Sequence, residues 1–372
     1  MGAYLSSPVT TKDTWDGTAG DVVYGGAGMQ GWRRTMEDAH IAEAVDDADT
    51  SIFGVFDGHG GAEVARFCQR HMVAELRKTE EYAQSHMDAA LVRAFHRMDD
   101  MLRESKFSEE IEGLKVKEPG EDDDMGGEDG DGEGPMDALD LLKRVFQYKS
   151  RSSWADGAAA AAPDSAEGAA ASKAAETLVK EDPEEAVVQA GCTAVVALKR
   201  GNKLYVANAG DSRGVLCRGK TAVSLSEDHK PSQEGERSRI IAAGGFLSEI
   251  GGVCRVNGNL NLSRAIGDLR YKMNGDLPAK SQIITAEPDV RSFELTSEDR
   301  FFVLACDGVW DVMSNQDVVD FVLARLEQGM DPTQISIAML DACLANDPKE
   351  ARGVGCDNMT AIVVMLHHKT VA

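Results

Sequence analysis

Aspartate residues stand at the ends of strongly hydrophobic runs in this sequence, and glycine follows two of them directly. One run ends at Asp57 in "FGVFDGHGG", and another ends at Asp307 in "FFVLACDGVWD". Carboxylate oxygens are the ligands that hard cations such as Mg²⁺ and Mn²⁺ prefer. Because neighbours on one strand point to opposite faces, a metal centre needs carboxylates from several strand ends. The repeated pattern therefore suggests metal-assisted chemistry.

A larger set of acidic side chains lies at the ends of expected strands or just before them. The set consists of Glu37, Asp38, Asp57, Asp211, Asp307 and Asp357. Gly58 adds a further ligand atom, because a glycine lets its own carbonyl approach an ion closely. A single Asp-Gly pair is more often an ordinary tight turn. Its recurrence among separate acidic strand ends, in a sequence without a nucleophile motif, favours a metal site.

The composition limits the classes of partner. The chain has 372 residues, 42% of them hydrophobic, and a formal net charge of −24. This hydrophobic content is sufficient for a buried core. Nucleic acids and anionic membranes are bound by clustered Lys and Arg, so the acidic composition argues against both. It fits a protein with basic partners or bound cations.

Cysteine usage and the N-terminal residues bear on the compartment. The seven cysteines are scattered and form no CxxC pair, which predicts reduced thiols rather than disulfides or a zinc site. No hydrophobic run has the length of a membrane span. The start "MGAYLS" fits the N-myristoylation pattern with Gly2 as the acceptor. Since one acyl chain binds membranes only marginally, we expect a cytoplasmic protein, with a nuclear location or weak membrane association as alternatives.

The chain divides into three zones by composition. Residues 21–105 and those from Ala186 onward have a globular composition, whereas about 107–185 is acidic and rich in Ala and Gly. That middle zone has too few large hydrophobic residues to offset the entropy cost of ordering it. We therefore predict a single domain over residues 21–372 with a mostly disordered insertion, preceded by a tail at residues 1–20.

Local patterns predict hairpin-linked strands with helices between them. The stretch "TAVVALKRGNKLYVANAG" predicts two strands joined by a Gly-Asn turn, and "FFVLACDG" and "MTAIVVML" predict buried strands. Helical spacing is found from Val64 to Met72 and over about 89–102. In "SNQDVVDFVLARLEQG", Ser314 can cap a helix and Gly329 follows its end. This alternation indicates antiparallel sheets covered by helices rather than a parallel βαβ array.

Six motifs, in order, closely resemble the metal-dependent serine/threonine protein phosphatases of type 2C, the PPM family. They are "MQGWRRTMEDAH", "FGVFDGHGG", "VANAGDSRGVL", "LSRAIGD", "FFVLACDGVWDVMS" and "GCDNMTAIVV". The resemblance covers nearly all of both globular zones and excludes the insertion. It implies an α+β fold, a four-layer α-β-β-α sandwich of two antiparallel β-sheets flanked by antiparallel helix pairs. It also implies that residues 21–372 form one catalytic domain.

The resemblance implies which residues bind two Mg²⁺ or Mn²⁺ ions. Asp57 would bridge the two ions, and Asp307 and Asp357 would complete one site. The other site would be formed by Glu37, the Gly58 carbonyl and, through water, Asp38. A hydroxide bridging the ions would attack phosphorus, because two divalent cations acidify water strongly. The expected reaction is hydrolysis of phosphoserine and phosphothreonine in proteins.

Further roles follow from the same resemblance. Asp211 with Asp307 would hold a weaker third ion, and Arg33 would grip the substrate phosphate. His59 would act as the general acid that protonates the leaving alkoxide. Asp268, in "RAIGDLRYK", would support the centre without binding metal. The expected partners are phosphoproteins, and we expect a monomer.

Other functions compete with this one. A catalytically dead relative that binds phosphoproteins as an adaptor should lack one or more ligands, yet every expected ligand is present. A third hypothesis makes the protein an acidic scaffold that acts through its insertion. Within that insertion, residues 129–140 resemble an EF-hand loop, but a solvated acidic tract is the more common explanation. The lone GxGxxG in "GGAGMQG" is weak evidence for a nucleotide site.

Overall fold

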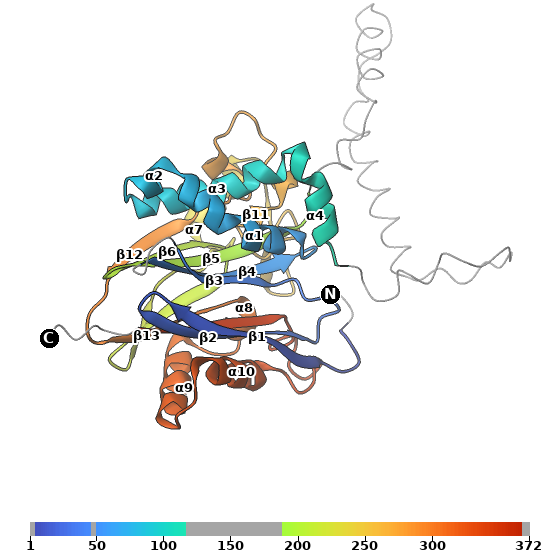
Figure 1. Cartoon of the computed structure of the whole chain (residues 1–372). Helices are drawn as coiled ribbons and strands as arrows, with labels where there is room; N and C mark the ends of the chain where they lie inside the picture. The colour runs from blue at the N-terminus through green and yellow to red at the C-terminus, as the bar shows by residue number, and fades with distance from the viewer. Residues whose placement is uncertain (1–3, 46–49, 117–187, 367–372) are drawn as a thin grey trace, which may run out of the picture. The chain divides into compact units, whose positions relative to one another are not determined.

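Two antiparallel β-sheets stack face to face in the computed structural model, which describes residues 4–45, 50–116 and 188–366 (Figure 1). The first sheet contains, in spatial order, β12 (Asp289–Glu294), β6 (Lys203–Ala209), β5 (Gly191–Arg200), β4 (Thr50–His59) and β3 (Ala39–Ala44), with β11 (Ile266–Gly267) paired to β5. The second contains β1 (Val9–Ala19), β2 (Val22–Gly31), β14 (Met359–Leu366), β13 (Asp299–Ala305), β7 (Arg213–Arg218) and β8 (Thr221–Ser224).

Helices cover the outer face of each sheet (Figure 1). Beside the first sheet lie α1 (Glu63–Lys78), α2 (Glu80–Ala83), α3 (Met87–Leu102) and α4 (Ser108–Leu114). Beside the second lie α9 (Asn315–Glu327) and α10 (Pro332–Cys343), and the one-turn α8 (Asp307–Trp310) directly follows β13. The α-β-β-α sandwich predicted from the sequence is thus confirmed.

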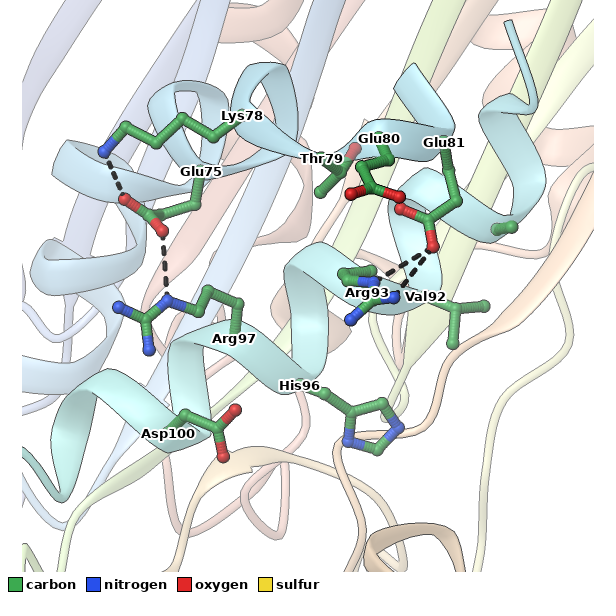
Figure 2. A pocket seen from close by; sticks show the side chains of 11 residues that line it. Glu75, Lys78, Thr79, Glu80, Glu81, Val92, Arg93, His96, Arg97 and Asp100 are labelled. Carbon is green, nitrogen blue, oxygen red and sulfur yellow. Dashed lines mark hydrogen bonds and ion pairs between the residues drawn. The ribbon is translucent and has the colours of Figure 1, made fainter. Parts of the chain in front are cut away.

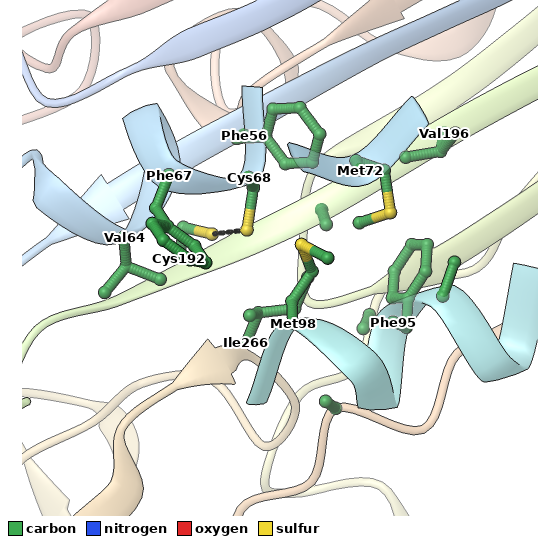
Figure 3. Packing of buried hydrophobic residues seen from close by; sticks show 14 of the residues in the cluster. Phe56, Val64, Phe67, Cys68, Met72, Phe95, Met98, Cys192, Val196 and Ile266 are labelled. Atoms are coloured by element: carbon green, nitrogen blue, oxygen red, sulfur yellow. Dashed lines mark hydrogen bonds between the residues drawn. The ribbon is translucent and has the colours of Figure 1, made fainter. Parts of the chain in front are cut away.

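Strand periodicity explains how the layers are built. Along β4, Ile52 and Phe56 face α1 and α3, whereas Phe53 and Val55 face the second sheet. Side chains alternate between the two faces of a strand, so one hydrophobic strand supplies two cores. Figure 3 shows the core under α1 and α3, where Phe67 of α1 is fully buried. The last residues of β4 are therefore oriented by packing on both faces.

Helix ends match their sequence signals. Ser314 caps α9 in a reciprocal capping box with Asp317, and Gly329 follows the helix with φ of 80°. Asp331 caps α10 in the same way with Gln334. Such caps satisfy backbone N–H groups that have no partner within the helix. The predicted start and end of α9 are confirmed.

A smaller section joins β8 to β12. It contains α7 (Glu234–Ala242) and a separate hairpin of β9 (Leu247–Ile250) and β10 (Val253–Val256). Three short 3₁₀ turns complete the described elements, at Ser105–Phe107, Leu269–Tyr271 and Ala279–Ser281.

The N-terminal residues differ from the expected tail at residues 1–20. Val9–Ala19 forms β1, which pairs along β2 and extends the second sheet. Polar residues such as Asp13 and Asp16 hide this strand from a hydrophobicity pattern, because an edge strand has mainly exposed side chains. The insertion expected at about 107–185 begins with described helix, α4, and residues 117–187 lie outside the described residues.

Candidate metal centre and phosphate site

The predicted acidic residues lie close together because several strands begin or end at the same end of the sandwich. In the first sheet, β3 begins where β4 and β6 end, since antiparallel neighbours run in opposite directions. In the second sheet, β13 ends where β14 begins. Residues that flank these ends are therefore neighbours in space although they are far apart in sequence.

Asp57 lies at the centre of this arrangement. It shares strand parity with Phe53 and Val55, so its side chain points into the space between the sheets. One carboxylate oxygen of Asp57, one of Asp38 and Cys306 Sγ all lie within 4.8 Å of one another. The two sheets thus bring side chains from both halves of the chain to one point.

Charge interactions indicate that the other carboxylates lie close to Asp57. Burial, followed by the negative charge of Asp307 and Asp38, raises the pKa of Asp57 well above its usual range. Asp357 and Asp211 act on the Asp57 pKa in the same direction. Burial, with Asp211 and Asp357, likewise raises the pKa of Asp307. Carboxylates this close cannot all be ionised without a compensating positive charge.

Asp38 provides a test of whether the site suits a divalent cation. Its Oδ2 accepts a hydrogen bond of 2.7 Å from Thr360 Oγ1. Its Oδ1 is buried and has no hydrogen-bond partner among the described residues. Burial raises the Asp38 pKa to about 7. A buried carboxylate oxygen without a donor, inside a cluster of acids, fits a cation with oxygen ligands.

In both Asp-Gly pairs the glycine lies against a main-chain carbonyl oxygen. A Cβ added to Gly58 would lie 2.3 Å from the carbonyl oxygen of Glu37. A Cβ added to Gly308 would lie 2.2 Å from the carbonyl oxygen of Asn358. Neither glycine has a positive φ, so close approach rather than backbone conformation requires glycine here. The sequence analysis anticipated close approach only at Gly58.

Glu37 is held by its own loop and by the turn that follows β4. Thr35 Oγ1 donates to Glu37 Oε1 at 2.8 Å, and the Gly61 N–H donates to Oε2 at 3.2 Å. These donors orient the carboxylate beside the end of β4. The structure places Glu37 beside Gly58, and its role as a metal ligand stays a prediction.

Arg33 lies at the exposed edge of the acidic cluster. Its side chain is 52% exposed, and its Nη2 lies 2.5 Å from Asp357 Oδ2. A guanidinium that is both accessible and fixed by a carboxylate can bind a phosphate from solvent. The structure places Arg33 beside Asp357, and its role in phosphate binding stays a prediction.

His59 forms an ion pair with a buried acid. Its Nε2 lies 2.6 Å from Asp268 Oδ2, and the side chains are 25% and 1% exposed. Burial lowers the His59 pKa, but the Asp268 carboxylate outweighs this effect, so the His59 pKa is raised. A Cβ on Gly191 would come within 2.7 Å of both side chains, so glycine at the start of β5 makes room for the pair.

Lys230 and Asp311 were missed from the sequence. Lys230 Nζ forms a close ion pair with Asp211 Oδ2. Asp311 directly follows α8, one helical turn after Asp307, and burial raises its pKa while Lys230 opposes that shift. The i, i+4 spacing in "DGVWD" is the signal that could have identified Asp311 beside the cluster.

A cavity of about 740 Å³ lies elsewhere, between α1, α2 and α3 (Figure 2). Its cations are paired with carboxylates of the same lining: Arg93 with Glu81, and both Lys78 and Arg97 with Glu75. An anion entering this cavity would have to compete with those pairs.

Two sequence expectations fall outside this site. Gly2, the expected acyl acceptor, and residues 129–140 lie outside the described residues. Among the helices of the described residues, none is both long and apolar enough to cross a membrane.

The chain is similar to known proteins over nearly its full length. A family model described as protein phosphatase 2C matches residues 22–116 and 145–351. The chain is 41% identical over 366 residues to probable protein phosphatase 2C 21 of Arabidopsis thaliana, an alignment covering 98% of this chain and 92% of that protein. It is 38% identical over 370 residues to protein phosphatase 2C 1 of Paramecium tetraurelia, covering 98% and 99%.

A solved structure shares the fold. The crystal structure of serine-threonine phosphatase 2C from Toxoplasma gondii superposes with a TM-score of 0.63 and 19% sequence identity, covering 96% of this chain and 100% of that one. The family model and the relatives that are 38% and 41% identical over nearly the full length show that the chain belongs to the protein phosphatase 2C family.

Proposed function

We propose that this protein phosphatase is a Mg²⁺- or Mn²⁺-dependent enzyme that hydrolyses phosphoserine and phosphothreonine in proteins. The observation that carries the proposal is the convergence of Asp38, Asp57 and Asp307 at one edge of the sandwich, with an unpartnered buried oxygen on Asp38. Such a set is electrostatically incomplete without cations.

The residues divide between two ions. Asp57 would bridge them, because its carboxylate lies in the middle of the cluster. Asp307 and Asp357 would complete the first site, beside α8 and β14. The second would be formed by Glu37, the Gly58 carbonyl and, through water, Asp38. Asp211 with Asp307 would hold a weaker third ion, in competition with the ammonium of Lys230.

The chain's own groups then act on the substrate. When bound, the paired cations would supply the nucleophile by acidifying water and would offset charge on the phosphoryl oxygens. Arg33 would bind two of those oxygens and orient phosphorus for in-line attack. His59, protonated through its pairing with Asp268, would give its proton to the departing serine or threonine oxygen.

Several features of the protein are part of the same proposal. Residues 21–372 would form one catalytic domain, and the insertion would serve a partner or a regulator rather than the reaction. The protein would act as a monomer in the cytoplasm or nucleus, and acylation of Gly2 would add at most weak membrane binding.

Release of phosphate from a phosphothreonine peptide tests the proposal. The rate should depend on added Mn²⁺ and should be abolished in Asp57→Ala. Asp320→Ala, an exposed acid on α9, is the matched control and should retain full activity. Equal rates with Mn²⁺, without it and in Asp57→Ala would exclude the metal-dependent reaction. Binding of the phosphopeptide without phosphate release would instead indicate an adaptor.

A further inference from the structure

Asn358 is a buried amide between the two halves of the site. It follows Asp357 directly, precedes β14, and is 5% exposed. Its carbonyl oxygen packs against Gly308 of the second Asp-Gly pair. The residue was not among those expected from the sequence to take part in the site.

The Asn358 side chain holds a distant loop by three hydrogen bonds. Nδ2 donates to the carbonyl oxygens of Gln30 and Thr35, each at 2.9 Å. Oδ1 accepts from the Glu37 N–H, also at 2.9 Å. Both amide hydrogens and the amide oxygen are therefore used. All of the partners belong to the main chain of residues 30–37, the end of β2 with the loop that follows it.

That loop carries groups of two kinds. Arg33 is its phosphate-binding residue, and Glu37 is its metal-binding residue. On the other side of Asn358, its own backbone N–H donates to Asp357 Oδ1 at 2.7 Å. Asn358 thus contacts the loop through its side chain and a ligand of the first ion through its main chain.

We propose that Asn358 is a positioning residue that fixes Arg33 and Glu37 relative to Asp357, so that metal binding and phosphate binding act as one unit. The proposal rests on the metal centre proposed above. Asn358 would act through these residues rather than by binding substrate or an ion itself. It acts by holding three main-chain groups of half-buried residues, so that the loop keeps its binding geometry before any ion arrives.

A purely structural role would have different consequences, and the chain offers a matched control. Gln282 is also 5% exposed and makes the same set of bonds within another loop. Its Nε2 donates to the carbonyl oxygens of Asn274 and Leu277, and its Oε1 accepts from the Asn274 N–H. None of the proposed metal ligands lies in that loop.

The test measures Mn²⁺ affinity by titration calorimetry on chelator-treated protein, for the wild type, Asn358→Ala, Gln282→Ala and Asp57→Ala. Asn358→Ala should weaken Mn²⁺ binding about 10- to 100-fold, the range for residues that orient metal ligands. Gln282→Ala should lower the thermal midpoint by about as much as Asn358→Ala does, but it should leave Mn²⁺ affinity unchanged. Equal affinity in Asn358→Ala and the wild type would overturn the proposal.

Two further measurements separate a failure of this proposal from a failure of the metal centre and from misfolding of the variant. If Asp57→Ala also binds Mn²⁺ normally, the metal centre itself is wrong, which is a failure of the proposed function. If Asn358→Ala does not fold, hydrogen exchange on the metal-free wild type decides. The Glu37 amide should then be protected as strongly as the strand amide of Ala361, and free exchange at Glu37 would overturn the proposal.

Discussion

His59 Nε2 lies 2.6 Å from the carboxylate of Asp268, a residue 209 positions later in the chain. Asp268 is 1% exposed and has a left-handed backbone conformation, with φ of 49° and ψ of 39°. A non-glycine residue with such angles persists only where the surrounding structure holds it, and this is common at functional sites. The pair gives the proposed general acid a fixed partner.

Asp268→Asn should move the alkaline limit of the reaction to lower pH. In the wild type the pKa of His59 lies above its ordinary value of 6.5, because Asp268 outweighs the effect of burial. A general acid works only while protonated, so activity is lost as the pH rises through that pKa. Without the carboxylate, burial lowers the His59 pKa, so activity is lost from a lower pH upward.

The measurement is kcat against pH with a phosphothreonine peptide at saturating Mn²⁺. Asp299→Asn is the control. Asp299 is, like Asp268, a buried acid in an ion pair, but its partner is Arg218 and it lies at the end of β13 away from the acidic cluster. An alkaline limb that does not move in Asp268→Asn would contradict the pairing as the cause.

His59→Gln should affect substrates according to their leaving group. A serine or threonine alkoxide leaves poorly without a proton, so hydrolysis of a phosphothreonine peptide should fall by about 10²- to 10⁴-fold. p-Nitrophenyl phosphate releases a stabilised phenolate and should lose far less. Equal losses on both substrates would show that His59 does not donate the proton.

Asp307→Asn should make the metal-free protein more stable while abolishing activity. Burial and neighbouring acids raise the Asp307 pKa, so the folded state holds protons that the unfolded state releases above about pH 3.8. The stability of the metal-free wild type should therefore fall as pH rises above that value. The amide removes one of the charges, and a gain of about 1 kcal/mol or more is expected at pH 7.

Urea unfolding of chelator-treated protein at pH 5 and pH 8 checks this prediction. Added Mn²⁺ should stabilise the wild type and should have much less effect on Asp307→Asn. A metal-free wild type that is equally stable at both pH values, and no less stable than the variant, would show that the carboxylates do not repel one another.

Gly308→Ala should disturb the metal centre by displacing Asn358. The new methyl group would overlap the Asn358 carbonyl, which costs about 1–3 kcal/mol as an overpacking change. Movement of Asn358 should also weaken Mn²⁺ binding. Gly275→Ala is the control, because no heavy atom lies within 4 Å of its added Cβ, and its stability should stay within about 0.5 kcal/mol of the wild type. Normal Mn²⁺ affinity in Gly308→Ala would contradict the close packing.

Glu236→Gln should loosen the section between β8 and β12. Glu236 is 5% exposed, and burial raises its pKa, but Arg264 and Arg239 outweigh burial and lower it from 4.5 to about 2. Its pairing stabilises the fold above pH 4.5 and is lost as the pH falls toward 2. A shift of that size corresponds to about 3 kcal/mol at pH 7.

Unfolding of Glu236→Gln at pH 7 and pH 3 gives the measurement. The variant should be less stable than the wild type at pH 7, and this difference in stability should be smaller at pH 3. Glu294→Gln, which removes an exposed pair with Lys203, should change little. A constant gap at both pH values would show that the ionised carboxylate is not what stabilises this section.

Local patterns predicted much of the fold because their physical causes are local. The hairpin around Gly201 follows from turn chemistry, and the start of α9 at Ser314 follows from capping. The strand β1 escaped notice because its residues are mainly exposed, and its pairing with β2 rather than its own sequence makes it a strand.

The sequence by itself determined the chemistry of the site: which carboxylates, which arginine and which histidine were available, and that acidic strand ends recur. Only the tertiary structure decided which of them meet. Asn358 reaches Glu37 across 321 positions and Asp268 reaches His59 across 209, and Lys230 and Asp311 join the cluster through sheet stacking and a helical turn. Hydrogen bonds and charge interactions depend on distances of a few ångströms, and pairing between strands sets those distances for residues hundreds of positions apart.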